Sequence, residues 1–183
     1  MDTRQAIQQA LAYAYLGVSP TASLLTYLCP IDRSPGSPGY QIAMAVQSAK
    51  IRGAINDQPK HIADWLNFCY APDVEAIHKP IKQACVATVL ANTASIGPYS
   101  VKRADRMRTL LYLAVEDYRV GMFMSAGLPV AAYLDVMGVN GAHWARDWEP
   151  FRRKALMKIK DFDNEGVAKV SIVLRAIREA ERE

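Results

Sequence analysis

The chain has 183 residues, of which 51% are hydrophobic and 22% charged, and its formal net charge is +4. This composition excludes a disordered chain, and because the sequence has neither a long apolar run nor a basic-then-apolar N-terminus, we expect an intracellular protein with no membrane span. Cys29, Cys69 and Cys85 form no CxxC pair, which argues against a disulfide framework and favours buried thiols.

The sequence predicts an all-α fold. Alanine, leucine, glutamine and methionine are abundant, whereas alternation of β-branched residues at period two is almost absent. We expect a first helix over residues 3–16, where apolar residues recur every four positions, and a short apolar helix over residues 22–28. The segment 30–40 contains three prolines and two glycines, so it is expected to be a loop, and the sequence assigns it no role.

Three further helices are expected in the middle of the chain, over residues 41–56, 61–70 and 80–93. The last of them is apolar on most sides, which favours a place at the centre of a bundle. This part of the chain also holds four potential metal ligands, which are His61, Cys69, His78 and Cys85. Their spacing matches no zinc ribbon or finger, so a zinc site is a minor alternative to buried thiols and we assign no metal ligand.

The second half of the sequence has clearer helix boundaries. The helices expected there cover residues 101–124, 129–137 and 142–149, with a C-terminal helix after residue 166. Gly138 is expected to end the second of these helices, and Asn140 to cap the third at its N-terminus. Pro150 must either kink that third helix or begin another, and residues 161–166 are expected to form a turn.

The basic residues concentrate in two segments. The first holds Lys102, Arg103, Arg106 and Arg108 with a single counter-charge, Asp105. The second holds Arg146, Arg152, Arg153, Lys154, Lys158 and Lys160 with only two acidic residues. Lysine and arginine provide the phosphate contacts that dominate affinity for nucleic acids, so this distribution permits binding to a polyanion.

A helix, a glycine turn and a second helix follow one another around Gly138, which is the order of a helix-turn-helix motif. The apolar contacts between its two helices would come from Tyr133, Met137, Val139 and Trp144. Two positions depart from the motif, because Leu134 stands where a small residue is usual and Asp147 where an apolar residue is expected. The sequence therefore predicts a helical bundle that contains a helix-turn-helix.

Three segments are expected along the chain. Residues 1–40 hold the N-terminal helix and the loop rich in proline and glycine, and residues 41–100 form a helical core. Residues 101–183 hold the helix-turn-helix DNA-binding region and the C-terminal helix.

Ten residues are the candidate DNA contacts. We expect Asn140, His143 and Arg146 to point toward base edges, where sequence is read. Contacts to backbone phosphates are expected from Arg152, Arg153, Lys154, Lys158, Lys102, Arg103 and Arg106. The alternative is that these charges form only a solvated face. Trp144 is expected in the core, and Trp148 either packs against the C-terminal helix or contacts the DNA backbone.

Signatures of catalysis are absent from the sequence. It contains no phosphate-binding lysine loop, no nucleophile elbow and no metalloprotease helix motif. The acidic pair Glu116 and Asp117 is adjacent in the chain, so the two side chains diverge on a helix. We therefore expect no catalytic residue, no cofactor and no enzymatic activity.

The segment LAVEDYRVGMFMSAGLPVAAYLDVMGVNGAHWARDWEPFRRKALMKI resembles the C-terminal DNA-binding half of the late-gene antitermination Q proteins of lambdoid phages. Tyr118 and Gly121 correspond to an aromatic residue and a glycine on a helix of that family, and residues 129–154 to its short helix, glycine turn and basic reading helix. The upstream piece AINDQPKHIADWLNFCYAP, with Trp65 and Tyr70, is similar to the family's N-terminal helices. The chain lacks the zinc-finger cysteine cluster of the lambda branch.

The resemblance implies a protein of the bacterial host cytoplasm that binds double-stranded DNA at a late promoter. It also implies that the protein joins RNA polymerase and makes it pass terminators, without catalysis by the factor itself. Two alternatives stay open from the residues alone. One is a helical protein-interaction or phage assembly factor whose basic segments contact an acidic partner, and the other is a simple helix-turn-helix repressor.

Overall fold

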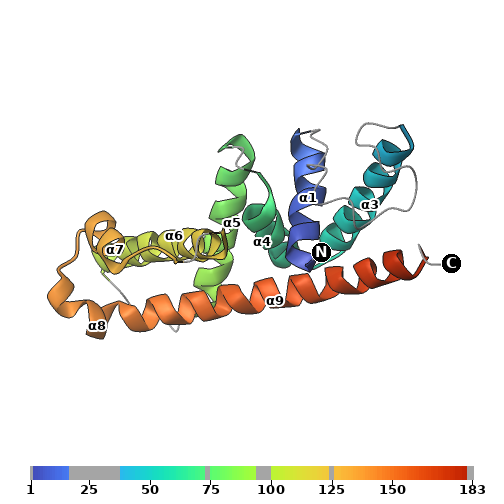
Figure 1. Ribbon diagram of the computed structural model, residues 1–183. Helices are drawn as coiled ribbons and strands as arrows, with labels where there is room; N and C mark the ends of the chain where they lie inside the picture. The colour runs from blue at the N-terminus through green and yellow to red at the C-terminus, as the bar shows by residue number, and fades with distance from the viewer. Residues whose placement is uncertain (1, 17–37, 73–74, 94–99, 124–125, 181–183) are drawn as a thin grey trace. The chain divides into compact units, whose positions relative to one another are not determined.

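The computed structural model describes residues 2–16, 38–72, 75–93, 100–123 and 126–180 (Figure 1). Its α-helices are α1 (Thr3–Leu16), α3 (Pro38–Asn56), α4 (Lys60–Tyr70), α5 (Glu75–Thr93), α6 (Val101–Phe123), α7 (Val130–Met137), α8 (Trp144–Asp147) and α9 (Glu149–Ala180). A short 3-10 helix, η1 (Gly141–His143), precedes α8. These ranges contain no strand, so the predicted all-α fold is confirmed. Across the same ranges no helix has the length and apolarity that crossing a bilayer requires.

Contacts within the chain group it into two compact units. The first unit comprises residues 1–78 and 163–183, and the second comprises residues 79–162. The expected segment boundaries at residues 40 and 100 follow a different division and stay predictions. The expected helix over residues 22–28 and most of the expected loop over residues 30–40 lie outside the described residues.

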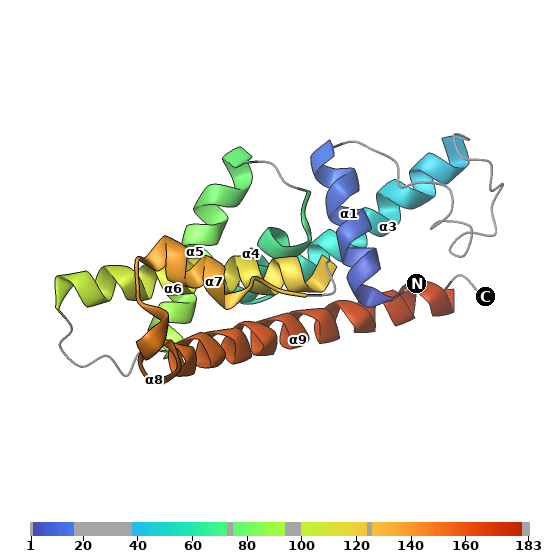
Figure 2. The ribbon, with the colours of Figure 1, turned by 60° about the vertical axis from the view of Figure 1, so that its left-hand side comes forward.

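In the first unit, α1 packs against α3 and α4, as both views of the ribbon show (Figures 1 and 2). The predicted bounds of α1 are confirmed, whereas α3 begins at Pro38, inside the expected loop. Ile7, Leu11 and Ile55 are among the side chains that this packing removes from solvent. Proline is tolerated at the start of α3 because the first turn of a helix does not use its backbone N–H groups internally.

One buried carboxylate joins three helices of the first unit. The side chain of Asp163, on α9, is fully buried and accepts hydrogen bonds from Tyr70 Oη at 2.7 Å and Trp65 Nε1 at 3.4 Å. Arg4 on α1 donates to its second oxygen at 2.8 Å. Burial raises the pKa of Tyr70 above its ordinary value, and the neighbouring Asp163 carboxylate raises it further. The Tyr70 hydroxyl therefore stays a proton donor to Asp163 over the whole neutral range.

The expected turn over residues 161–166 is wrong, because α9 is a continuous helix from Glu149 to Ala180. The polar and glycine residues that predicted a turn serve tertiary packing here. Asp163 is buried against its three donors, and Gly166 lies so close to α4 that an added Cβ would stand 2.9 Å from both Ile62 and Leu66. Gly166 also accepts a hydrogen bond at its carbonyl from Gln58 Nε2 at 3.2 Å. These contacts outweigh the weak local preference for a turn.

The second unit is built from α6, α7, η1 and α8, with the parts of α5 and α9 that fall within residues 79–162. Helices α6 and α7 pack against each other (Figures 1 and 2). Lys82 on α5 forms an ion pair with Glu116 on α6, and its ammonium lies 3.6 Å from the centre of the Tyr112 ring. Helix α5 begins at Glu75, five residues before the expected start of the helix at Pro80. Pro80 therefore lies in the interior of the helix.

Candidate nucleic-acid interface

The turn after α7 has a fixed backbone. Gly138 takes a left-handed conformation with φ of 57°, which glycine adopts without steric cost, so the predicted C-terminal cap is confirmed. Asn140 is confirmed as the N-cap of η1, since its carboxamide oxygen accepts a hydrogen bond from the Ala142 backbone at 2.9 Å. Arg106 on α6 donates to the Gly138 carbonyl at 2.8 Å. The bond from Arg106 attaches the turn to α6.

The elements after the turn are shorter than the expected helix over residues 142–149. The chain forms η1 and then the four-residue helix α8, and α9 begins directly afterwards at Glu149. Pro150 therefore lies in the first turn of α9. Of the two expected alternatives, it begins another helix and does not kink the preceding one. A reading helix of ordinary length is not present at this position, so the helix-turn-helix stays a prediction.

Aromatic residues hold the turn region on α7. The ring centres of Tyr133 and Trp144 are 5.5 Å apart, and both side chains are buried. Trp144 donates from its indole N–H to Glu149 at 3.0 Å, so its predicted place in the core is confirmed. Trp148 is buried as well, with the Arg103 guanidinium carbon 5.9 Å from its ring centre. The two tryptophans thus support the interface from beneath.

Asp117 on α6 is a second buried carboxylate with several donors. It accepts from Tyr133 Oη at 2.7 Å, from Arg152 Nη2 at 2.8 Å and from the Leu128 backbone at 2.6 Å. Burial raises the pKa of Tyr133, and the hydrogen bond to Asp117 adds to this shift. The Arg152 guanidinium also lies 5.1 Å from the centre of the Tyr133 ring. Asp117 therefore joins α6 to the start of α7 and the start of α9.

A hollow of about 520 Å³ lies between the N-terminal part of α6 and the turn after α7, and we call it the α6 hollow. Its polar lining is contributed by Ser100, Lys102, Arg103, Arg106, Asn140, His143 and Asp147. The two sequence segments that supply these residues are separated by more than thirty positions, and the fold brings them to one surface. Three permanent cations face one carboxylate here, so the α6 hollow carries a positive charge.

Arg146 lies beside this hollow and is engaged by its neighbour in sequence. Its guanidinium binds the Asp147 carboxylate at 2.7 and 2.9 Å, and its Nη2 is 3.5 Å from His143 Nδ1. The hydrogen bond from Arg146 lowers the pKa of Asp147. The Arg146 side chain is 73% exposed, so it is accessible, but its charge is largely offset by Asp147.

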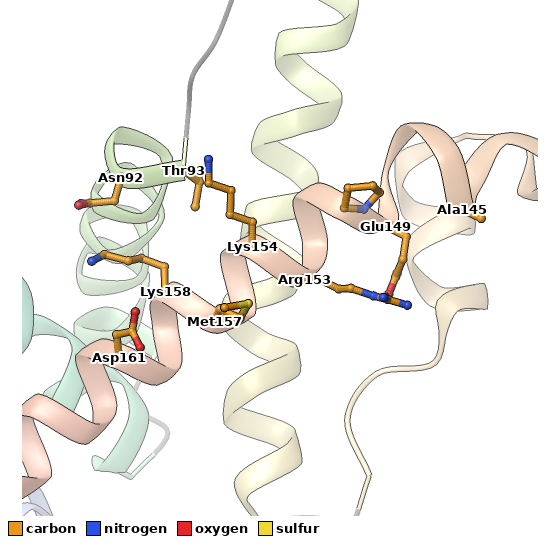
Figure 3. A pocket seen from close by; sticks show the side chains of 10 residues that line it. Asn92, Thr93, Ala145, Glu149, Arg153, Lys154, Met157, Lys158 and Asp161 are labelled. Carbon is orange, nitrogen blue, oxygen red and sulfur yellow. The ribbon is translucent and has the colours of Figure 1, made fainter.

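A second hollow of about 520 Å³ lies along the outer side of α9, and we call it the Met157 hollow (Figure 3). Arg153, Lys154, Met157 and Lys158 line it from α9, and Asn92 and Thr93 line it from the end of α5. In Figure 3 the Lys154 and Lys158 side chains extend from α9 toward the end of α5. Three of the ten expected DNA contacts thus lie at this second hollow.

The ten expected contacts fall into three groups. Five of them line the α6 hollow, and a sixth, Arg146, lies beside it. Three others line the Met157 hollow. Arg152 belongs to neither hollow, since its side chain is only 18% exposed and is bound to Asp117. Sequence reasoning missed the role of Asp117, although a carboxylate in register with the apolar residues Leu110 and Ala114 of α6 signals a buried partner.

Cys69 and Cys85 are buried, as expected for structural thiols, and Cys29 lies outside the described residues. Over the described ranges no three histidine, cysteine, aspartate or glutamate side chains gather in a way that could hold a metal ion.

Comparison with known proteins gives one family. No curated protein and no solved structure matches the chain significantly. The family model described as phage antitermination protein Q matches residues 40–183, which is well over half of the chain. This range includes both hollows and both buried carboxylates. The chain therefore belongs to the phage antitermination protein Q family.

Proposed function

We propose that the protein binds double-stranded DNA through the α6 hollow and acts on bacterial RNA polymerase so that transcription passes terminators. The observation that carries the proposal is the convergence of Lys102, Arg103 and Arg106 with the exposed Asn140 and His143 around one hollow. Membership of an antitermination family supports the part that concerns polymerase. The activity is one of binding in the host cytoplasm, with no chemical step by the factor.

The chemistry of the α6 hollow suits a phosphate backbone next to base edges. Lysine and arginine neutralise backbone phosphates and supply most of the affinity, whereas amide and imidazole groups can read bases. Asn140 and His143 stand on the exposed turn, and Arg106 holds that turn against α6. We assign Arg152 to positioning this surface, since its guanidinium is bound to Asp117.

The double substitution of Lys102 and Arg103 by alanine is expected to weaken duplex binding on every sequence. Two lost phosphate contacts should reduce the slope of log K against log salt concentration by roughly 2. Fluorescence anisotropy with a labelled duplex over a salt series measures both quantities. The matched control replaces Lys169 and Arg175, two exposed cations of the first unit, and should leave the slope unchanged. Equal slopes for the two double variants would contradict the assignment.

Transcription through a terminator tests the part of the proposal that concerns polymerase. The template carries, beside its promoter, a duplex selected from random sequence by its binding to the protein. We expect more read-through product with the natural protein and none of this gain with the Lys102 and Arg103 double variant. A block at initiation without read-through would identify a simple repressor instead.

Replacing Asp147 by asparagine is expected to strengthen duplex binding. The change removes the only carboxylate among the polar groups named at the α6 hollow and releases Arg146 from its ion pair. One additional available cation should raise affinity roughly three- to tenfold at low salt. Asp135→Asn removes the same charge from an exposed position of α7 and serves as the control in the same anisotropy experiment. Weaker binding by Asp147→Asn would mean that the Arg146 and Asp147 pair itself forms the contact.

A further inference from the structure

We propose that the Met157 hollow docks a segment of a partner protein in which an apolar side chain is flanked by carboxylates. The inference rests on the proposed function only for the identity of the partner, which would belong to the transcription machinery. The binding itself follows from the shape and charge of the hollow and can be measured separately.

The hollow is lined by one continuous stripe of α9. Pro150, Arg153, Lys154, Met157, Lys158 and Asp161 follow one another at steps of three, one, three, one and three residues, so they share one helical face. The opposite face carries Ala155, Ile159 and Phe162, which are buried. The stripe is thus the outward face of a helix whose inner face already has its packing partners.

Met157 gives this face an apolar centre. Its side chain is 69% exposed, although it lies within the hollow (Figure 3). Pro150 and Ala145 extend the apolar lining. An unbranched thioether side chain adapts to partners of different shape, which makes methionine frequent at binding surfaces. A partner side chain placed here would remove apolar surface from water on both sides.

Three cations surround Met157, and only one of them forms an ion pair within the described part of the chain. Arg153 donates to Glu149 at 2.9 Å, which offsets its charge. Within the described part of the chain no carboxylate pairs with Lys154 or Lys158, although the Lys158 ammonium lies 5.1 Å from the Phe162 ring centre. Two lysines beside an apolar centre complement a segment that carries carboxylates next to an apolar residue.

The same features argue against a DNA backbone in this hollow. Glu149 and Asp161 line it as well, so three cations face two carboxylates, whereas three cations face one at the α6 hollow. A duplex presents a row of phosphates and offers no apolar side chain to cover Met157. The Met157 hollow is therefore better matched to a peptide, and phosphate binding belongs to the α6 hollow.

Short fluorescent peptides of three kinds test the proposal on the full-length protein. The first has a central leucine among aspartates and glutamates, the second replaces the leucine by serine, and the third replaces the acids by asparagine and glutamine. We expect only the first to bind. Met157→Ser should weaken that binding about tenfold or more, because the buried apolar contact is lost. Ile172→Ser is the matched control, because Ile172 lies on the same helix and its side chain is 65% exposed. This variant should bind the first peptide as tightly as the natural protein does.

The outcomes separate this inference from the proposed function. Failure of every peptide to bind at millimolar concentration, or equal binding to the Met157→Ser and Ile172→Ser variants, would overturn the docking site. Loss of duplex binding in Met157→Ser would identify the hollow as a nucleic-acid surface and would overturn it too. Unchanged duplex binding in that variant supports the inference. The Lys102 and Arg103 double variant should lose affinity for the duplex and retain its affinity for the first peptide. If its duplex affinity is unchanged, that result contradicts the proposed function alone.

Discussion

Replacing Asp117 by alanine is expected to lower the free energy of unfolding by about 3 kcal/mol, because it leaves donors without their shared acceptor in a buried site. Tyr133 loses the partner of its hydroxyl, Leu128 the partner of its backbone N–H, and Arg152 its buried counter-charge. Urea denaturation followed by tryptophan fluorescence measures the change. Asp105→Ala is the matched control on α6, since Asp105 is exposed and pairs only weakly with Arg108, and it should stay within about 0.5 kcal/mol of the natural protein.

The Asp117 variant should also bind duplex DNA less tightly under conditions where it is folded, although Asp117 does not line the α6 hollow. The carboxylate positions α7 and the start of α9, and the turn that carries Asn140 and His143 lies between them. Asp117→Asn retains an acceptor oxygen. Its free energy of unfolding and its affinity for duplex DNA should both lie between those of the natural protein and those of Asp117→Ala. Unaltered stability and unaltered DNA affinity in Asp117→Ala would show that the buried network does not hold the interface.

Replacing Asp163 by alanine is expected to cost about 3 kcal/mol as well, in the first unit of the protein. The hydroxyl of Tyr70 and the indole N–H of Trp65 would then be buried without their acceptor. The ion pair with Arg4 adds less, because the Arg4 side chain is 40% exposed and the pair is screened by solvent. The transition measured by near-ultraviolet circular dichroism should shift to lower urea concentration.

Glu165→Ala is the control for Asp163→Ala, because Glu165 is exposed on the same helix two residues away. Its midpoint in urea should match that of the natural protein. If the two variants unfold together, the three donors around Asp163 contribute nothing measurable to stability. Tyr70→Phe, which removes one donor and keeps the ring, should reproduce about 1 kcal/mol of the effect.

The helices could be predicted from local pattern wherever the pattern and the tertiary packing agree. The bounds of α1 follow from its apolar periodicity, and the caps at Gly138 and Asn140 follow from residue types with a single strong preference. The failure at residues 161–166 has a physical reason. Most of the residues there are weak helix formers, and contacts with α1 and α4, which lie far away in sequence, keep them helical.

The sequence predicts which basic residues are candidates for the interface. It does not predict how the fold distributes them between two hollows. The clusters of lysine and arginine could be found by counting charges. The pairing of Arg152 with Asp117 spans 35 positions and leaves the Arg152 side chain only 18% exposed, and its expected contact with DNA stays a prediction. The separation of the remaining cations into two hollows depends on which face of α6 and α9 is buried, and periodicity gives that face only approximately.

The cap at Asn140 restricts what this residue can recognise. A carboxamide ordinarily offers an acceptor oxygen and a donor NH₂ group side by side, which is how asparagine pairs with adenine. In this chain the oxygen accepts from the Ala142 backbone N–H at 2.9 Å, which uses one of its two lone pairs and ties the carboxamide to the turn. Under the proposed DNA binding, Asn140 would therefore meet a base edge with the orientation that the cap gives it, and a bidentate contact would need the base in the plane of the carboxamide. The bond that shapes the turn thus also sets the direction from which a ligand could approach this side chain.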